Sequence, residues 1–379
     1  MQAVPPASAV VPGLGAVVRG VRSALEGLPL TDAFDPRANP PGMLYLSLPV
    51  SDICNYRCRH CHIWMKEQSA DALSRARRIE LVEEFSRLNP QGTVVLPGGE
   101  VTLDMDELLA VAGACRDASL PCVIMTNGSR ITTPETARAL VTSGVTFCAV
   151  SLDSHLPEIH NFTRGLAAAF DETTRAIRLL AEARDLYAAE RFRLCVTGVL
   201  FKENLAHFPE FVAFCRGLGA QHVDLQVLAR TFSNAHESRD AFFEKHFWHA
   251  AEEKAEARRL FSAFLTELDP RGEFLVKRPA DLDWILRYVD DPDFSTEEPI
   301  CGSHHTNLIV DARGDAALCF NTKRILDDPF VGNARDSSLA DLWRGAKAAE
   351  DRDVMDACTM NCGALNCHRK KAEVAMAGA

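Results

Sequence analysis

The stretch Cys54-Asn-Tyr-Arg-Cys58-Arg-His-Cys61 holds three cysteines within eight residues, separated by three residues and then by two. Thiolates are soft ligands, and they favour iron–sulfur clusters, zinc or copper(I) over ions that prefer oxygen. A [4Fe–4S] cluster normally takes four cysteine ligands, so three thiolates on one loop would leave one iron open to a ligand from outside the protein. We therefore predict that Cys54, Cys58 and Cys61 hold such a cluster.

Zinc is the alternative metal for this loop, with His60 or His62 as a fourth ligand, because zinc binds mixed Cys/His tetrahedra. Zinc loops usually come as two cysteine pairs on separate turns, and no second pair lies near this one. The spacing therefore favours the open iron–sulfur cluster. A zinc-bearing binding protein without catalysis is the alternative hypothesis from another functional class.

The segments around the cysteine loop alternate between strand-like and helix-like patterns. MLYLSLPV (43–50) predicts a first strand that runs directly into the loop. Five more strand-like segments follow, from TVVLPGG to QHVDLQVL, and helix-like segments such as IELVEEFSRLN lie between them. Six strands with intervening helices imply a parallel sheet with right-handed crossovers, in which chemistry is built at the carboxyl ends of the strands.

The cysteine spacing, with a ring side chain (His60) before the last cysteine, resembles the signature of the radical S-adenosylmethionine (SAM) superfamily. In that family the ring is more often Tyr or Phe. The resemblance implies an α/β fold, a partial (β/α)6 TIM-like barrel. It also implies that the cluster binds SAM, takes an electron from a donor such as flavodoxin or ferredoxin, and cleaves SAM to methionine and a 5′-deoxyadenosyl radical that abstracts a substrate hydrogen.

Polar residues after consecutive strands match the family position by position. Gly98-Gly99-Glu100 corresponds to the loop that holds the amino group of SAM through its carbonyls or the Glu100 side chain, although Val101 replaces the usual proline. Thr126-Asn127-Gly128 and Ser151-Leu152-Asp153-Ser154 resemble the next two strand ends. Each motif is weak alone, since Gly, Asn and Asp are ordinary turn residues, but their order and spacing strengthen the set.

Arg164 corresponds to a residue that often meets the SAM carboxylate, which a guanidinium fork suits. A surface salt bridge is the alternative role for this arginine. The residues that the resemblance assigns to SAM binding are Gly98, Gly99, Glu100, Thr126, Asn127, Ser151, Asp153 and Arg164.

A second group of cysteines lies in the C-terminal part of the chain. Cys301 and Cys319 enclose HTNLIVDARGDAALCF, which predicts a hairpin with DARGD as its turn, so that both thiols can face one point. Cys358, Cys362 and Cys367 follow. Together with the GN…SL…LW pattern between residues 332 and 343, these resemble the auxiliary-cluster module of the SPASM/twitch subfamily. Five cysteines fit the shorter twitch type, with one auxiliary [4Fe–4S] cluster and one thiol left over; structural zinc is the alternative.

The chain is predicted to fall into four parts. Residues 1–42 form a leader with a helix near 17–28, and residues 43–230 form the barrel core. Residues 231–299 form a helical bridge, in which 240–268 predicts one or two amphipathic helices with a buried aromatic stripe. Residues 300–379 form a small α+β auxiliary-cluster domain.

Composition excludes several classes of function. The 379 residues carry a net charge of −11, which argues against a nucleic-acid partner because phosphate binding needs concentrated Lys and Arg. No apolar run is long enough to cross a bilayer, and the first residues lack the positive cluster of a secretory signal. We therefore expect a cytoplasmic protein in which the 13 cysteines indicate metal rather than disulfides. Five cysteines are expected to be small core residues: Cys115, Cys122, Cys148, Cys195 and Cys215.

The substrate class is less well marked. Many peptide-modifying relatives carry an N-terminal peptide-recognition domain, and the 42-residue leader is too short and too rich in Pro and Gly to be one. We therefore expect a small hydroxylated metabolite, such as an aminocyclitol or sugar, that is dehydrogenated or rearranged; a ribosomal peptide is the alternative. The second cluster would take an electron from the substrate radical or bind the substrate. Candidate acid/base or substrate residues beside it are His304, His305, Asn321 and Lys323.

Overall fold

The computed structural model describes residues 43–227, 245–246, 248–267, 274–276 and 282–362, all within one compact unit, Pro40–Ala379. Three predictions lie wholly or partly outside the described residues. These are the helix near 17–28, the Phe242, Phe243 and Phe247 part of the aromatic stripe, and the ligand Cys367.

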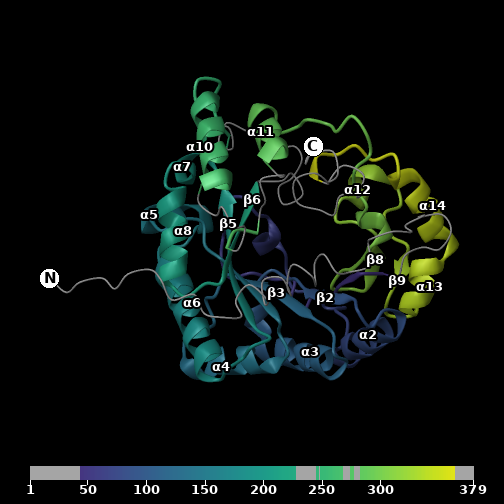
Figure 1. The fold of residues 1–379 in the computed structure, drawn as a ribbon. Coiled ribbons are helices and arrows are strands. Elements are labelled where there is room, and N and C mark those ends of the chain that lie inside the picture. Colours follow the sequence, from purple (N-terminus) through teal and green to yellow (C-terminus); the bar gives the residue numbers. More distant parts are fainter. Residues whose placement is uncertain (1–42, 228–244, 247, 268–273, 277–281, 363–379) are drawn as a thin grey trace. The chain divides into compact units, whose positions relative to one another are not determined.

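Within the described residues, nine strands form one sheet in the order β6-β5-β4-β3-β2-β1-β7-β8-β9. Each neighbouring pair from β1 to β6 is parallel, so the predicted six-stranded α/β core is confirmed (Figure 1). The strands are β1 (Tyr45–Ser47), β2 (Thr93–Leu96), β3 (Cys122–Thr126), β4 (Phe147–Ser151), β5 (Arg193–Leu200), β6 (His222–Val227), β7 (Asn307–Val310), β8 (Asp315–Ala317) and β9 (Gly332–Asn333).

The helices that connect the parallel strands lie along the outer side of the curved sheet (Figure 1). Side chains of Ser74, Asp104 and Thr133 cap the first three of these helices by accepting a backbone N–H three residues on, which fixes where each helix begins. The described α-helices are α2 (Arg75–Leu88), α3 (Met105–Asp117), α4 (Pro134–Ser143), α5 (Pro157–Arg164), α6 (Ala169–Leu186), α7 (Lys202–Leu205), α8 (Phe208–Gly217), α10 (Lys254–Glu267), α11 (Leu282–Asp290), α12 (Thr322–Ile325), α13 (Leu339–Arg344) and α14 (Ala346–Met355).

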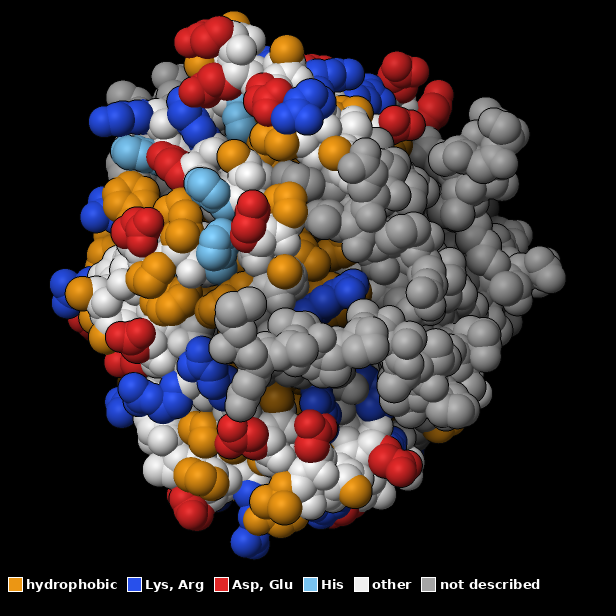
Figure 2. Space-filling model, turned by 60° about the vertical axis from the view of Figure 1, so that its left-hand side comes forward, with side chains coloured by type: hydrophobic (Ala, Val, Ile, Leu, Met, Phe, Trp, Pro, Cys, Tyr) orange, Lys and Arg blue, Asp and Glu red, His pale blue; other side chains and the backbone are white. Residues whose placement is uncertain are grey.

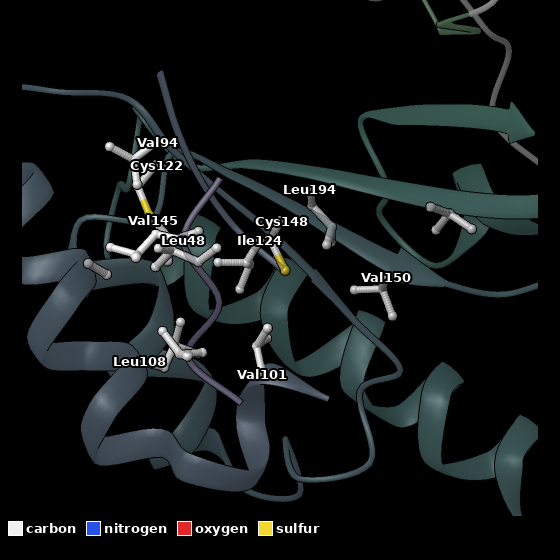
Figure 3. Close-up of a cluster of buried hydrophobic side chains, with 14 of the residues drawn as sticks. Leu48, Val94, Val101, Leu108, Cys122, Ile124, Val145, Cys148, Val150 and Leu194 are labelled. Atoms are coloured by element: carbon white, nitrogen blue, oxygen red, sulfur yellow. The ribbon is translucent and has the colours of Figure 1, made fainter. Parts of the chain in front are cut away.

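The main core lies between the sheet and these helices. Successive side chains of a strand point to opposite faces, so every second residue of the strands enters the core. Figure 3 shows this layer, which contains Leu48, Val94, Ile124, Val150 and Leu194 among others. The five cysteines predicted to be core residues are all buried, which confirms that prediction.

The predicted C-terminal hairpin is present as β7 and β8, which pair antiparallel with Ile309 opposite Ala317. It is not confined to a separate small sheet, because β7 also pairs parallel with β1, with Tyr45 opposite Asn307. The pairing gives β1 a partner on each side and so covers a sheet edge that would otherwise be open. The cysteine loop leaves the carboxyl end of β1, whereas Cys301 and Cys319 flank the amino end of β7.

Within the described residues, the bridging part of the chain contributes α10, which lies inside the range 240–268 predicted to hold one or two helices, and α11, which lies beyond that range. Phe261 of α10 is buried in the main core, and Trp248 donates from Nε1 to the Tyr288 hydroxyl at 2.9 Å. Of the predicted aromatic stripe, Trp248 alone is described, and it is half-buried against the main core.

Candidate active site

The three cysteines of the first motif are gathered in one small apolar cluster with Tyr56 and Ala169. Tyr56 anchors the loop to α6 by donating its hydroxyl to Glu172 at 2.8 Å. Burial, together with the charges of the neighbouring thiols, raises the pKa of Cys54 to about 12, and burial also raises the pKa of Cys58 and Cys61. The metal-free thiols are therefore neutral at pH 7, and a metal would have to displace their protons.

Each of the three sulfurs already has a hydrogen-bond donor. Asn127 Nδ2 lies 4.0 Å from Cys54 Sγ, Arg164 Nη1 lies 4.0 Å from Cys58 Sγ, and Ile63 N lies 3.5 Å from Cys61 Sγ. Donors of this kind orient thiolate ligands and stabilise their negative charge. The arrangement is one in which three thiolates can be held for a metal cluster.

Gly98 and Gly99 pack against the backbone of the cysteine loop. Gly99 N donates to Ser51 O at 3.1 Å, and Glu100 N donates to Ile53 O at 2.8 Å. A Cβ on Gly99 would lie 2.0 Å from the Ile53 carbonyl oxygen, so a side chain here would displace the loop. Glycine at these positions therefore lets the backbone of residues 98–99 lie directly against the backbone of the cysteine loop.

Glu100 is 1% exposed, and both of its carboxylate oxygens accept hydrogen bonds within the chain. Oε1 accepts from Thr102 N at 3.0 Å and from the hydroxyls of Thr102 and Thr126 at 2.5 Å each, while Oε2 accepts from Asn127 N at 2.6 Å. The side chain therefore joins the carboxyl ends of β2 and β3. Two acceptors were predicted for the SAM amine, the Glu100 carboxylate and the glycine carbonyls. Because the Glu100 carboxylate already accepts hydrogen bonds within the chain, the glycine carbonyls stay as the predicted acceptors.

Asp153 and Arg164 form a buried ion pair behind Cys58. Arg164 Nη2 lies 2.7 Å from Asp153 Oδ1, and Thr163 donates its hydroxyl to Asp153 Oδ2 at 2.7 Å. Burial alone would raise the pKa of Asp153, but Arg164 and His160 beside it hold that pKa well below its usual range. Arg164 is 7% exposed, so the alternative of a surface salt bridge is wrong.

Ser151 belongs to a polar row that the sequence motifs did not reveal. Val223 and Leu225 of β6 are in the core, so His222, Asp224 and Gln226 point to the opposite face of the sheet. Ser151 of β4 is paired with Thr197 of β5, and Thr197 with Asp224 of β6, all on that face. The signal in the sequence was the alternation in QHVDLQV, where every second residue is polar.

Four of the five C-terminal cysteines also come together. Burial raises the pKa of Cys319 to about 12, and the nearby thiols of Cys362, Cys301 and Cys358 add to the rise. Ser303 N and Asn321 N donate to Cys301 and Cys319 at 3.5 and 3.3 Å. Asn321 also donates from Nδ2 to Cys362 Sγ at 3.1 Å, which makes it a residue that orients sulfurs rather than an acid or base.

The other candidates beside this site have different surroundings. His304 and His305 are buried, and Nε2 of each lies 3.0 and 2.9 Å from Oδ1 of Asp356, two residues before Cys358. They tie the Cys301 segment to the Cys358 segment. Lys323 is exposed and lies over the Phe330 ring, 5.3 Å from its centre.

Within the described part of the chain, one set of three His, Cys, Asp or Glu ligand atoms lies within 4.8 Å of one another, that of His304, His305 and Asp356.

Two family models match this chain. The radical SAM superfamily model covers residues 48–215, and the iron–sulfur cluster-binding domain called SPASM covers residues 301–368. The chain belongs to the radical SAM superfamily. It is a radical SAM enzyme with a C-terminal SPASM-type domain, as the cysteine patterns predicted.

The relatives of this radical SAM enzyme carry names that describe different activities. It is 28% identical over 193 residues to an AdoMet-dependent heme synthase of Oleidesulfovibrio alaskensis, covering 49% of this chain and 46% of that protein. It is also 28% identical over 193 residues to the mycofactocin maturase MftC of Mycolicibacterium smegmatis, covering 50% of this chain and 46% of MftC. The chain thus spans about half the length of these relatives.

Among solved structures, SuiB of Streptococcus suis bound to the precursor peptide SuiA matches 95% of this chain and 79% of SuiB, with a TM-score of 0.61 and 14% identity. A likeness at this identity concerns the fold. It confirms the partial-barrel architecture of this radical SAM enzyme together with its C-terminal domain.

The residues of this enzyme fit the cofactors of its family, which are a SAM-binding [4Fe–4S] cluster, an auxiliary cluster and SAM. The first motif offers three sulfurs with donors in place, and the C-terminal site offers four. Arg164 Nε is buried and has no hydrogen-bond partner among the described residues, so this N–H beside the first site is available to a bound ligand. The assignment of individual ligands and SAM contacts stays a prediction.

No helix in the described part of the chain is long and apolar enough to cross a membrane. On the face shown in Figure 2, Lys and Arg are interspersed with Asp and Glu, and histidines gather among hydrophobic side chains.

Proposed function

We propose that this radical SAM enzyme oxidises a substrate that binds against the polar row Ser151–Thr197–Asp224, which runs from the carboxyl end of β4 to the middle of β5 and β6. When bound, SAM and its cluster supply a 5′-deoxyadenosyl radical, which removes one hydrogen atom from the substrate. The observation that carries the proposal is the alignment of this row on the face of the sheet away from the helices, together with the cysteine loop at the carboxyl end of β1.

Asp224 is the residue we propose to position the substrate and accept its proton. Its side chain accepts from Gln226 Nε2 at 3.2 Å, so the carboxylate is already oriented by a neighbour on the same strand. In a two-electron oxidation the substrate loses one hydrogen atom, one proton and one further electron. Asp224 would take the proton, and the four cysteines at the start of β7 would hold the acceptor of the electron.

We propose a peptide as the substrate. SuiB, whose fold matches nearly the whole chain, was solved with a precursor peptide, and MftC is named as a maturase. The expectation of a hydroxylated metabolite depends on residues 1–42, which lie outside the described residues. That metabolite class is the second candidate, because a carboxylate and an amide on one strand also suit a polyhydroxylated ligand.

The test uses anaerobically reconstituted enzyme, reduced with dithionite or with flavodoxin or ferredoxin as the electron donor. Peptide libraries and a panel of sugars and aminocyclitols are incubated with SAM, and release of 5′-deoxyadenosine is measured together with product mass. We expect a peptide to lose two hydrogens for each 5′-deoxyadenosine released. If product forms together with 5′-deoxyadenosine only from sugars or aminocyclitols, the substrate is a metabolite and not a peptide.

Two cysteine variants separate the sites in the same assay. Cys58→Ala should abolish release of 5′-deoxyadenosine, whereas Cys362→Ala should retain part of it. The wild-type protein should contain about eight irons with matching sulfide if both clusters are [4Fe–4S]. Zinc without iron, or a fully active Cys58→Ala variant, would overturn the assignment.

A further inference from the structure

Arg164 is fixed against the cysteine loop by its backbone. It is the last residue of α5, and Gly165 ends the helix with a φ of +67°, where a Cβ would lie 2.2 Å from the Arg57 carbonyl oxygen. Arg59 N donates to Thr163 O at 2.9 Å. The carboxyl end of α5 therefore lies directly on the loop that carries the cysteines, and the Arg164 side chain starts from a position set by that loop.

The guanidinium group is held in place at two nitrogens. Nη2 donates to Asp153 Oδ1 at 2.7 Å, and Nη1 points to Cys58 Sγ at 4.0 Å. Asp153 Oδ1 also accepts from Val199 N at 3.1 Å, so the carboxylate is oriented by the backbone of β5. A bidentate grip on a carboxylate needs two N–H groups on one edge of the guanidinium. Each of these bonds uses one of the two N–H groups of its nitrogen, and Nε has no partner among the described residues, so the guanidinium keeps N–H groups for a further acceptor.

Cys58 has a donor that differs in charge from those at the other sulfurs. The donors at Cys54, Cys61, Cys301 and Cys319 named above are side-chain or backbone amides, which are neutral. At Cys58 the donor is a buried cation. Hydrogen bonds from charged groups are about twice as strong as neutral ones, and donors to cluster sulfurs change the reduction potential of the cluster.

We propose that Arg164 is a positioning residue of the SAM-binding cluster, in which the guanidinium held by Asp153 donates to the Cys58 thiolate and raises the reduction potential of that cluster. Reduction adds one electron to the cluster, and a cation at a ligand sulfur stabilises the more negative state. This inference depends on the family assignment and not on the substrate.

The experiment measures the midpoint potential of the SAM-binding cluster without SAM, by a redox titration followed by electron paramagnetic resonance. The signal of this cluster is recognised by its change when SAM is added. In Arg164→Gln we expect the ratio of reduced to oxidised cluster at a fixed potential to fall about tenfold, a shift of about 59 mV for a one-electron couple. The dissociation constant of SAM is measured separately, so that a change in the cluster is distinguished from a change in SAM binding.

Arg57→Gln is the matched control, because it also removes one positive charge beside Cys58 but from an exposed side chain. Its potential should equal that of the wild type. An unchanged potential in Arg164→Gln, or an equal shift in Arg57→Gln, would overturn the proposal. If Arg164→Gln fails to hold the first cluster, Arg164→Lys decides: an intermediate potential supports the proposal, and a wild-type potential with weakened SAM binding overturns it.

Discussion

Gly99→Ala tests whether the glycine loop serves the cysteine loop. The added Cβ would lie 2.0 Å from the oxygen and 2.2 Å from the carbon of the Ile53 carbonyl, and 2.8 Å from Cys54 N. These are backbone atoms, so the cysteine loop itself has to move. The displacement breaks the hydrogen bonds from Gly99 N and Glu100 N, which contribute about 0.5–1.5 kcal/mol each, and adds overpacking of about 1–3 kcal/mol. The total is about 2–6 kcal/mol.

The assay combines thermal unfolding with iron analysis after anaerobic reconstitution. Gly99→Ala should melt several degrees below the wild type and hold about half of the iron, because the C-terminal site is untouched. Gly113→Ala is the control: Gly113 lies in α3, where the nearest neighbour of an added Cβ is 3.9 Å away. Alanine there should stabilise the helix by up to about 1 kcal/mol. Full iron content and wild-type melting in Gly99→Ala would refute the reasoning.

Three further results are expected. Cys367→Ser should keep about eight irons per chain, whereas Cys319→Ser should lose about half, since three other cysteines already converge with Cys319; equal losses by iron analysis would contradict this. Burial lowers the pKa of His160 to about 3. As the pH falls below 6.5, the histidine is therefore protonated in the unfolded chain but not in the folded one. The free energy of unfolding should then fall by up to about 1.4 kcal/mol per pH unit until the pH reaches about 3. Denaturant unfolding at pH 7 and 5.5 should show a smaller drop in His160→Gln than in the wild type; an equal drop would rule this source out. Asp224→Asn should release 5′-deoxyadenosine with little product, and a wild-type ratio of the two would exclude Asp224 from the oxidation.

The sequence motifs identified which residues gather at the site but not what they contact. The Gly98-Gly99-Glu100 motif predicted an acceptor for SAM, yet the Glu100 carboxylate is used to join β2 to β3. Arg164 was predicted near SAM or on the surface, and it lies buried between Asp153 and Cys58. Such partners are set by how far each loop turns after its strand, and a motif of three residues does not encode that distance.

The polar row shows a second limit of the same kind. The alternation of His222, Asp224 and Gln226 is visible in the sequence, and it predicts a strand with one polar face. Whether that face meets water or a substrate depends on the register with β5, which brings Ser151 and Thr197 into line with Asp224. A shift of one residue would turn all three polar side chains of β6 into the core.

The pairing of β1 with β7 connects the two metal sites in a way that local patterns do not predict. The DARGD turn specifies the hairpin through contacts a few residues apart, whereas Tyr45 and Asn307 meet across most of the chain. Because β1 carries the cysteine loop at its carboxyl end and β7 begins beside Cys301 and Cys319, one hydrogen-bonded strand pair separates the sites. Their separation is therefore fixed by the backbone ladder and not by the linker between them, so an electron moving from a substrate at the first site to the second would always cross the same stretch of sheet.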